Sequence, residues 1–255
     1  MNNFHFGNNS DNFAKDFSNT EIKLKNKFYA VILSTFSVCL FLSIAIAFAV
    51  YGTLNGVLKN NHRLIFDWFN WFWIGFLIAT LVVMILISFL QKMSTKALLA
   101  SAPILIIYFG VSIGMGLFLY LRDSNWTYVV LAVFVVPTLI TFVFGLLGYF
   151  NLVNTTALST LLVVLLITLI VLIIVSIFIP SQSGSRLENW ISAIGTAIII
   201  ISIILNFWMI RKYADTVEFL GNKEIIRQGV FFGLQTFIQY AILIQYIMDI
   251  FHSHR

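Results

Sequence analysis

The sequence predicts an all-α membrane protein, a bundle of seven transmembrane helices. Three observations predict this fold class: hydrophobic residues make up 60% of the 255 residues, only 10% of the residues are charged, and no charge occurs in the 62 residues between Asp123 and Arg186. A soluble domain carries about 25% charged residues, so a water-exposed fold is excluded. A single cysteine, Cys39, also excludes a disulfide-stapled secreted module.

Seven segments are apolar over the length that a helix needs to cross the hydrocarbon core, which is about 20 residues. Their continuous apolar character differs from the alternating strands of a membrane barrel. We place them at 28–52, 69–91, 98–121, 126–149, 157–179, 189–210 and 229–251, after a polar, disordered N-terminal tail at 1–27 and before a C-terminal end at 252–255. The connectors are short, so 28–251 is predicted to form one domain.

The positive charges predict the orientation of this domain. Ten lysines and arginines fall in the tail and the even-numbered connectors, and five fall on the opposite side. By the positive-inside rule the N-terminus is cytoplasmic and the C-terminus lies outside. The outer interface then receives the tryptophans that such interfaces favour, Trp68, Trp71, Trp73, Trp126 and Trp190. The asparagine, lysine, isoleucine and phenylalanine bias of the composition favours a bacterial plasma membrane.

The predicted spans contain none of the groups that catalysis or metal binding requires. All four histidines lie outside the spans, and no span contains a lysine. The chain also has no zinc-protease, phosphate-loop or nucleophile-elbow motif. The sequence therefore predicts no enzymatic activity, no catalytic residue, no cofactor and no metal site. The positive charges are scattered, so nucleic acid is not a predicted partner. The predicted partner is the lipid bilayer.

Neutral polar residues form a stripe on each of the last two spans. A polar group that faces lipid costs several kcal/mol, so both stripes are expected to turn inward and meet, with the seventh helix near the middle. The candidate polar interior consists of Ser202, Asn206, Gln235, Thr236 and Gln239. Two interpretations stay open: these side chains hold helices together, or they line a conduit or a ligand-sensing interior.

The third span contains a G-x-x-x-G pattern formed by Gly110 and Gly114. Two glycines one helical turn apart leave a flat surface on which another helix can approach closely. We interpret this pair as a helix-packing site.

The order of motifs along the chain is also informative. A basic tail leads into KNKFYAVILSTFSVCLFLSIAIAFAVYG, the third span carries YFGVSIGMGLFL, and the sixth reads ISAIGTAIIIISIILNFWMIRKY. The fourth span passes through a short connector into a long apolar fifth span. Over about residues 25–250, this order resembles the Bax inhibitor-1 family of seven-helix membrane proteins.

The resemblance implies a function and a site. Members of this family leak calcium or other cations across membranes, and a pair of aspartates in the last two spans acts as a pH-sensitive latch. This chain carries Asn206 and Thr236 at the matching positions. Neither can ionise, so the resemblance implies a scaffold whose proton gating and calcium selectivity are lost or changed.

Three functions are therefore weighed. The leading expectation is a Bax inhibitor-1-like membrane protein with a weak, calcium-type cation leak through the polar interior. The alternative is a non-conducting scaffold or interaction protein. A small-solute transporter ranks lowest, because no span is broken by glycine or proline pairs at mid-membrane. The only proline well inside a span is Pro137.

Overall fold

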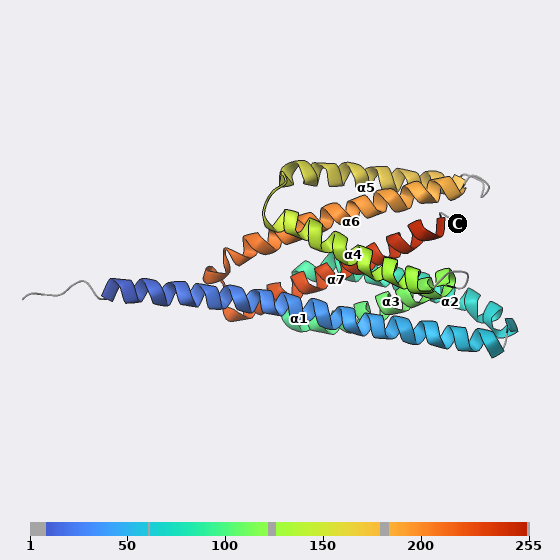
Figure 1. Ribbon diagram of the computed structural model, residues 1–255, viewed down its shortest axis with the longest axis horizontal. Coiled ribbons are helices and arrows are strands. Elements are labelled where there is room, and N and C mark those ends of the chain that lie inside the picture. The colour runs from blue at the N-terminus through green and yellow to red at the C-terminus, as the bar shows by residue number, and fades with distance from the viewer. Residues whose placement is uncertain (1–8, 61, 122–125, 179–183, 254–255) are drawn as a thin grey trace, which may run out of the picture.

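The computed structural model describes residues 9–60, 62–121, 126–178 and 184–253, and it contains no strand over these ranges (Figure 1). The predicted all-α fold with seven segments is confirmed, because each predicted segment lies mostly within one α-helix. The helices are α1 (Asn9–Asn60), α2 (His62–Phe89), α3 (Thr95–Leu121), α4 (Trp126–Tyr149), α5 (Thr155–Phe178), α6 (Gly184–Ala214) and α7 (Asn222–Ser253), with 3-10 turns η1 (Leu90–Lys92) and η2 (Val217–Phe219).

The lengths and apolar character of these helices suit a bilayer. Among the residues with described side chains, six helices are long and apolar enough to span a membrane, and α4 contributes a shorter apolar helix at Val133–Tyr149. Figure 1 shows the N-terminal end of α1 and the C-terminus at opposite ends of the bundle. This placement agrees with an odd number of crossings.

The connector between α4 and α5 shows how local sequence ends one helix and begins the next. Asn151 adopts a left-handed conformation with φ of 55°, which asparagine tolerates better than most residues. Asn154 then caps α5, because its Oδ1 accepts hydrogen bonds from the backbone N–H groups of Thr156 (3.1 Å) and Ala157 (3.2 Å). The long apolar run that follows has no glycine or proline to interrupt the helix.

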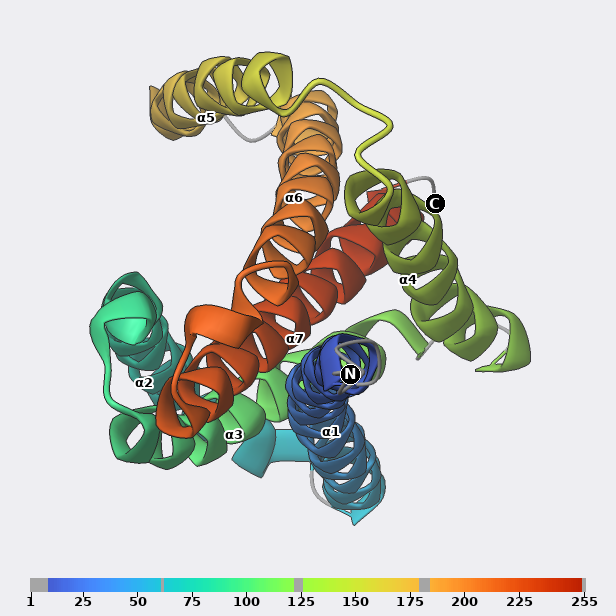
Figure 2. The ribbon, with the colours of Figure 1, turned by 90° about the vertical axis from the view of Figure 1, so that its left-hand side faces the viewer.

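Helix α7 lies in the middle of the bundle, where the sequence placed it (Figure 2). It packs against α1, α3, α4 and α6, whereas α5 packs mainly against α6 at the periphery. No residue in the most apolar stretch of α5 is buried. The central helix is therefore the one with the most polar face, and the most apolar helix is left facing lipid.

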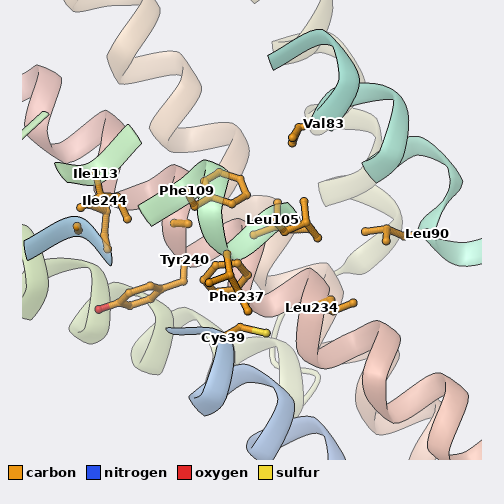
Figure 3. Packing of buried hydrophobic residues seen from close by; sticks show 14 of the residues in the cluster. Cys39, Val83, Leu90, Leu105, Phe109, Ile113, Leu234, Phe237, Tyr240 and Ile244 are labelled. Carbon is orange, nitrogen blue, oxygen red and sulfur yellow. The ribbon is translucent and has the colours of Figure 1, made fainter. Parts of the chain in front are cut away.

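The largest buried cluster joins α1, α3 and α7 (Figure 3). The rings of Phe109 and Phe237 meet edge to face, with centroids 5.7 Å apart and an interplanar angle of 90°. Cys39 is buried in the same cluster and forms no disulfide. Cys39 therefore packs as a small apolar core residue.

The N-terminal tail differs from the prediction of disorder over 1–27, because α1 already begins at Asn9. Residues 1–8 lie outside the described part of the chain. Two features stabilise the extension: Glu21 and Lys25 form an ion pair of 2.6 Å one turn apart, and Leu24 packs on an apolar cluster around Phe28. The polar composition of the tail does not indicate that Leu24 packs on this cluster.

The predicted tryptophan belt falls mostly on residues whose side chains lie outside the described part of the structure. This holds for Trp68, Trp71, Trp73 and Trp126. Trp190 is described and is exposed near the start of α6.

Candidate functional site

The candidate polar interior begins with a buried pair of side chains between α6 and α7. Asn206 is completely buried and Thr236 is nearly so. Asn206 Nδ2 donates a hydrogen bond to Thr236 Oγ1 over 3.0 Å. The Thr236 hydroxyl in turn donates to the Phe232 carbonyl over 2.8 Å, one turn earlier in its own helix. The structure therefore joins the two positions that the sequence predicted to meet.

These bonds fix the orientation of the Asn206 amide. The proton of the Thr236 hydroxyl is used by the Phe232 carbonyl, so Thr236 Oγ1 serves as an acceptor and requires an N–H donor. A flipped amide would place two acceptor oxygens against each other. Asn206 Oδ1 must then point elsewhere, and it has no hydrogen-bond partner among the described residues.

Gln239 repeats this arrangement about one helical turn away. Its Nε2 donates to the backbone carbonyl of Ser202 over 3.0 Å, and its Oε1 is buried without a described partner. Ser202 therefore enters the site through its main chain. Gln235 is half-buried, and its Oε1 is likewise unpaired within the described residues.

The register of the two helices places these oxygens close in depth. Asn206 meets Thr236 and Ser202 meets Gln239, so the numbers fall along α6 as they rise along α7, as in an antiparallel pair. Four residues on α6 and three on α7 separate the two contacts, which corresponds to about one helical turn of roughly 5.4 Å. Three unpaired carbonyl oxygens thus lie within about two turns of one helix pair.

A fourth unpaired oxygen belongs to α4 and was not among the predicted site residues. Thr141 Oγ1 is buried and has no described partner. It lies about one turn after Thr138, whose hydroxyl is 2.9 Å from the hydroxyl of Tyr240 on α7. The few threonines of this apolar span did not form a polar stripe like those of the last two spans, so the sequence analysis did not single out Thr141.

Another polar tie on α7 lies outside the predicted site. Gln245 Nε2 donates to the Ser112 hydroxyl of α3 over 2.6 Å. This bond links α7 to the opposite neighbour and makes Gln245 a useful reference for substitutions in the polar interior.

The two glycines of the third span lie against α1. A Cβ at Gly110 would fall 2.8 Å from Ile46 Cβ, and one at Gly114 would fall 2.7 Å from the Ala47 carbonyl oxygen. Any side chain here would push the helices apart. The G-x-x-x-G pair therefore permits the close packing of α1 on α3.

The chemistry of the site is neutral. No acidic residue occurs in α6 between Glu188 and Asp215, or in α7 between Glu224 and Asp249. The described residues also contain no cluster of three or more His, Cys, Asp and Glu side chains that could hold a metal. Amide and hydroxyl oxygens are the groups available to a ligand.

The fold and the site define an all-helical, multi-pass membrane protein with a polar, uncharged interior. The family model described as inhibitor of apoptosis-promoting Bax1 matches residues 25–255 of the chain. The chain therefore belongs to the Bax inhibitor-1 family, as the order of its motifs predicted. The searches of curated proteins and of solved structures returned no match.

Proposed function

We propose that this Bax inhibitor-1 family protein is a weak cation leak whose conduit passes the polar interior between α6 and α7. The observation that carries the proposal is the set of buried carbonyl oxygens without described donors, on Asn206, Gln235 and Gln239. An unpaired buried acceptor costs about 1–3 kcal/mol. A passing cation or its hydration water supplies the missing partner.

The absence of acids from this interior sets the expected properties of the leak. Calcium binds best to several oxygens that include carboxylates, so neutral oxygens hold it weakly and release it readily. Nor does either side chain of the Asn206 and Thr236 pair titrate between pH 5 and 8. We therefore propose a slow calcium-type leak that is insensitive to pH over this range.

Flux into dye-loaded vesicles tests the proposal. The full chain should admit calcium at a low rate that is equal at pH 5 and pH 8. Asn206→Leu and Gln239→Leu should each lower this rate, because they remove unpaired oxygens from the conduit. Gln245→Leu serves as the matched control, since it removes a glutamine from the same helix at the contact with Ser112. Vesicles that stay as tight as protein-free vesicles would end the proposal.

Restoring acids to the site gives a complementary test. The double substitution Asn206→Asp with Thr236→Asp places two carboxylates where a hydrogen bond of 3.0 Å now lies. Buried carboxylates at that spacing titrate as a coupled pair. The double variant should therefore show a flux that changes between pH 5 and 8, which the natural chain lacks.

The alternative function is a non-conducting scaffold that docks another membrane protein. It is favoured by the two hydrogen bonds between α6 and α7, from Asn206 to Thr236 and from Gln239 to the Ser202 carbonyl, because both hold the helices together. On this alternative the same substitutions reduce stability or recovery of a partner, and no basal leak exists to be lost. We propose that neither function involves catalysis.

We further propose that the N-terminus faces the cytoplasm of a bacterial cell and the C-terminus faces outside. The excess of lysine and arginine at the N-terminal end of the bundle supports this orientation. Reporter fusions at the two ends test this orientation. If a reporter that works only in the cytoplasm is active when fused to the C-terminus, the proposed orientation is wrong.

A further inference from the structure

An exposed phenylalanine stands on the turn that joins α6 to α7. Phe219 is 85% exposed, which makes it the most exposed large apolar side chain of the described residues. Apolar side chains on the spans face lipid tails, but this one lies in a connector beyond Arg211 and Lys212. Its exposure therefore requires a different explanation.

The turn that carries Phe219 is firmly anchored. Val217, two residues earlier, is fully buried in the cluster formed by Phe28 and Ile225, and Leu220 packs against the same cluster. The buried Val217 and the partly buried Leu220 hold Phe219 outward. An apolar ring is thus fixed at the end of the bundle, where water and headgroups meet.

Lysines lie near the turn that carries this ring. Lys27 Nζ donates to Asn222 Oδ1 over 2.8 Å, which places this part of α1 against the first residue of α7. Lys223 follows in sequence and is exposed, and Lys23 lies on the same face of α1, one turn before Lys27. None of these three lysines forms an ion pair with a described residue.

The acids at this end are largely occupied by other cations. Glu21 and Asp215 approach Lys25 at 2.6 Å and 3.6 Å, and Glu224 pairs with Arg227 at 2.6 Å. The exposed Glu218 lies beside Glu21. Over residues 20–27, 90–96 and 211–227 there are nine lysines and arginines against four acids, so a net positive charge remains on the end face that Figure 2 presents.

We infer that Lys23, Lys27, Phe219 and Lys223 form a binding surface for anionic lipid headgroups. An aromatic ring and lysines at one interface match the two parts of such a lipid: the ring enters the boundary of the acyl chains, and the ammonium groups pair with the phosphates. The occupant is a phospholipid of the leaflet in which this end already lies. This inference is independent of any ion leak.

Lipid retention by the full chain tests the surface. The protein is equilibrated in micelles with equal amounts of phosphatidylglycerol and phosphatidylcholine, and the retained lipids are measured by mass spectrometry. Phosphatidylglycerol should dominate, and sodium chloride raised from 0.1 to 0.5 M should reduce its excess. Lys27→Gln with Lys223→Gln should weaken its binding about 25-fold, from about 1 kcal/mol per lysine. Phe219→Ser should also weaken it.

The matched control is Lys92→Gln with Lys96→Gln, which removes two exposed lysines from η1 and the first turn of α3 at the same end. If this control variant retains about as much phosphatidylglycerol as the natural chain, the result supports the surface. If both double variants lose phosphatidylglycerol equally, the attraction is one of diffuse charge and the inference is overturned. Equal retention of both lipids by the natural chain, excess phosphatidylglycerol that ignores salt, or unchanged retention in Phe219→Ser would also overturn it.

Discussion

The substitution Thr236→Val tests the donor and acceptor that the structure assigns to the buried α6–α7 pair. Valine keeps the β-branched shape of threonine, so the loss of the hydroxyl is the main change. The Asn206 amide then keeps both polar atoms without described partners, because Nδ2 loses its acceptor and Oδ1 already has none. An unpaired buried group costs about 1–3 kcal/mol, which is the expected destabilisation.

The destabilisation caused by Thr236→Val should largely disappear when Asn206 is first replaced by leucine. Asn206→Leu loses one interhelical hydrogen bond, about 0.6 kcal/mol in a membrane protein, and removes an unpaired oxygen that costs about 1–3 kcal/mol. It is therefore expected to be neutral or to stabilise by up to about 2 kcal/mol. In that background Thr236→Val leaves no amide unsatisfied and should cost less than about 0.5 kcal/mol.

The assay is reversible unfolding of the natural chain, the two single variants and the double variant in mixed micelles. The coupling energy between the two positions is expected to be about 1–2 kcal/mol. The reasoning is refuted if Thr236→Val costs the same in both backgrounds. It is also refuted if Asn206→Leu destabilises by more than about 1 kcal/mol, since the unpaired oxygen would then carry no penalty.

Two further predictions concern packing and a polar clamp at the end of the bundle. Gly148→Ala should destabilise by about 1–3 kcal/mol, because the new Cβ overlaps the Ile204 carbonyl, whereas Gly75→Ala meets nothing within 4 Å and should be neutral or stabilising in thermal unfolding. Arg227→Gln removes the bonds from Arg227 to the carbonyls of Gln91 (3.1 Å) and Met93 (3.3 Å). Amide exchange in the α2–α3 connector should then accelerate about fivefold, and unchanged exchange would show that the clamp does not hold it.

The sequence predicted the helices well because a bilayer imposes a simple rule. Each span must be about 20 apolar residues long and must satisfy its own backbone, so length and composition locate it. The same rule placed the polar α7 in the centre, where the structure has it. It did not predict that α1 begins at Asn9, or that the Glu21–Lys25 pair and the packing of Leu24 stabilise part of this extension, because composition does not reveal such contacts.

The candidate site was only partly predictable. Periodicity brought Asn206 and Thr236 onto facing stripes, because inward orientation follows from the cost of polar groups in lipid. It could not reveal that Ser202 contributes its carbonyl in place of its hydroxyl, or which amide oxygens stay unpaired. Those features depend on the rotation and register of two helices, which a 3.6-residue period determines only to within about one turn.

The neutral pair joins α6 and α7 without a titratable group. A buried pair of aspartates closes two helices only while one proton is shared between them, so closure follows pH. Asn206 and Thr236 supply a donor and an acceptor at every pH, and their bond of 3.0 Å joins the same two helices. The amide also leaves Oδ1 unpaired, a cost that an apolar pair would avoid. On the proposed leak, a site that is polar but uncharged, at a cost in stability, lets hydrated ions pass without holding them.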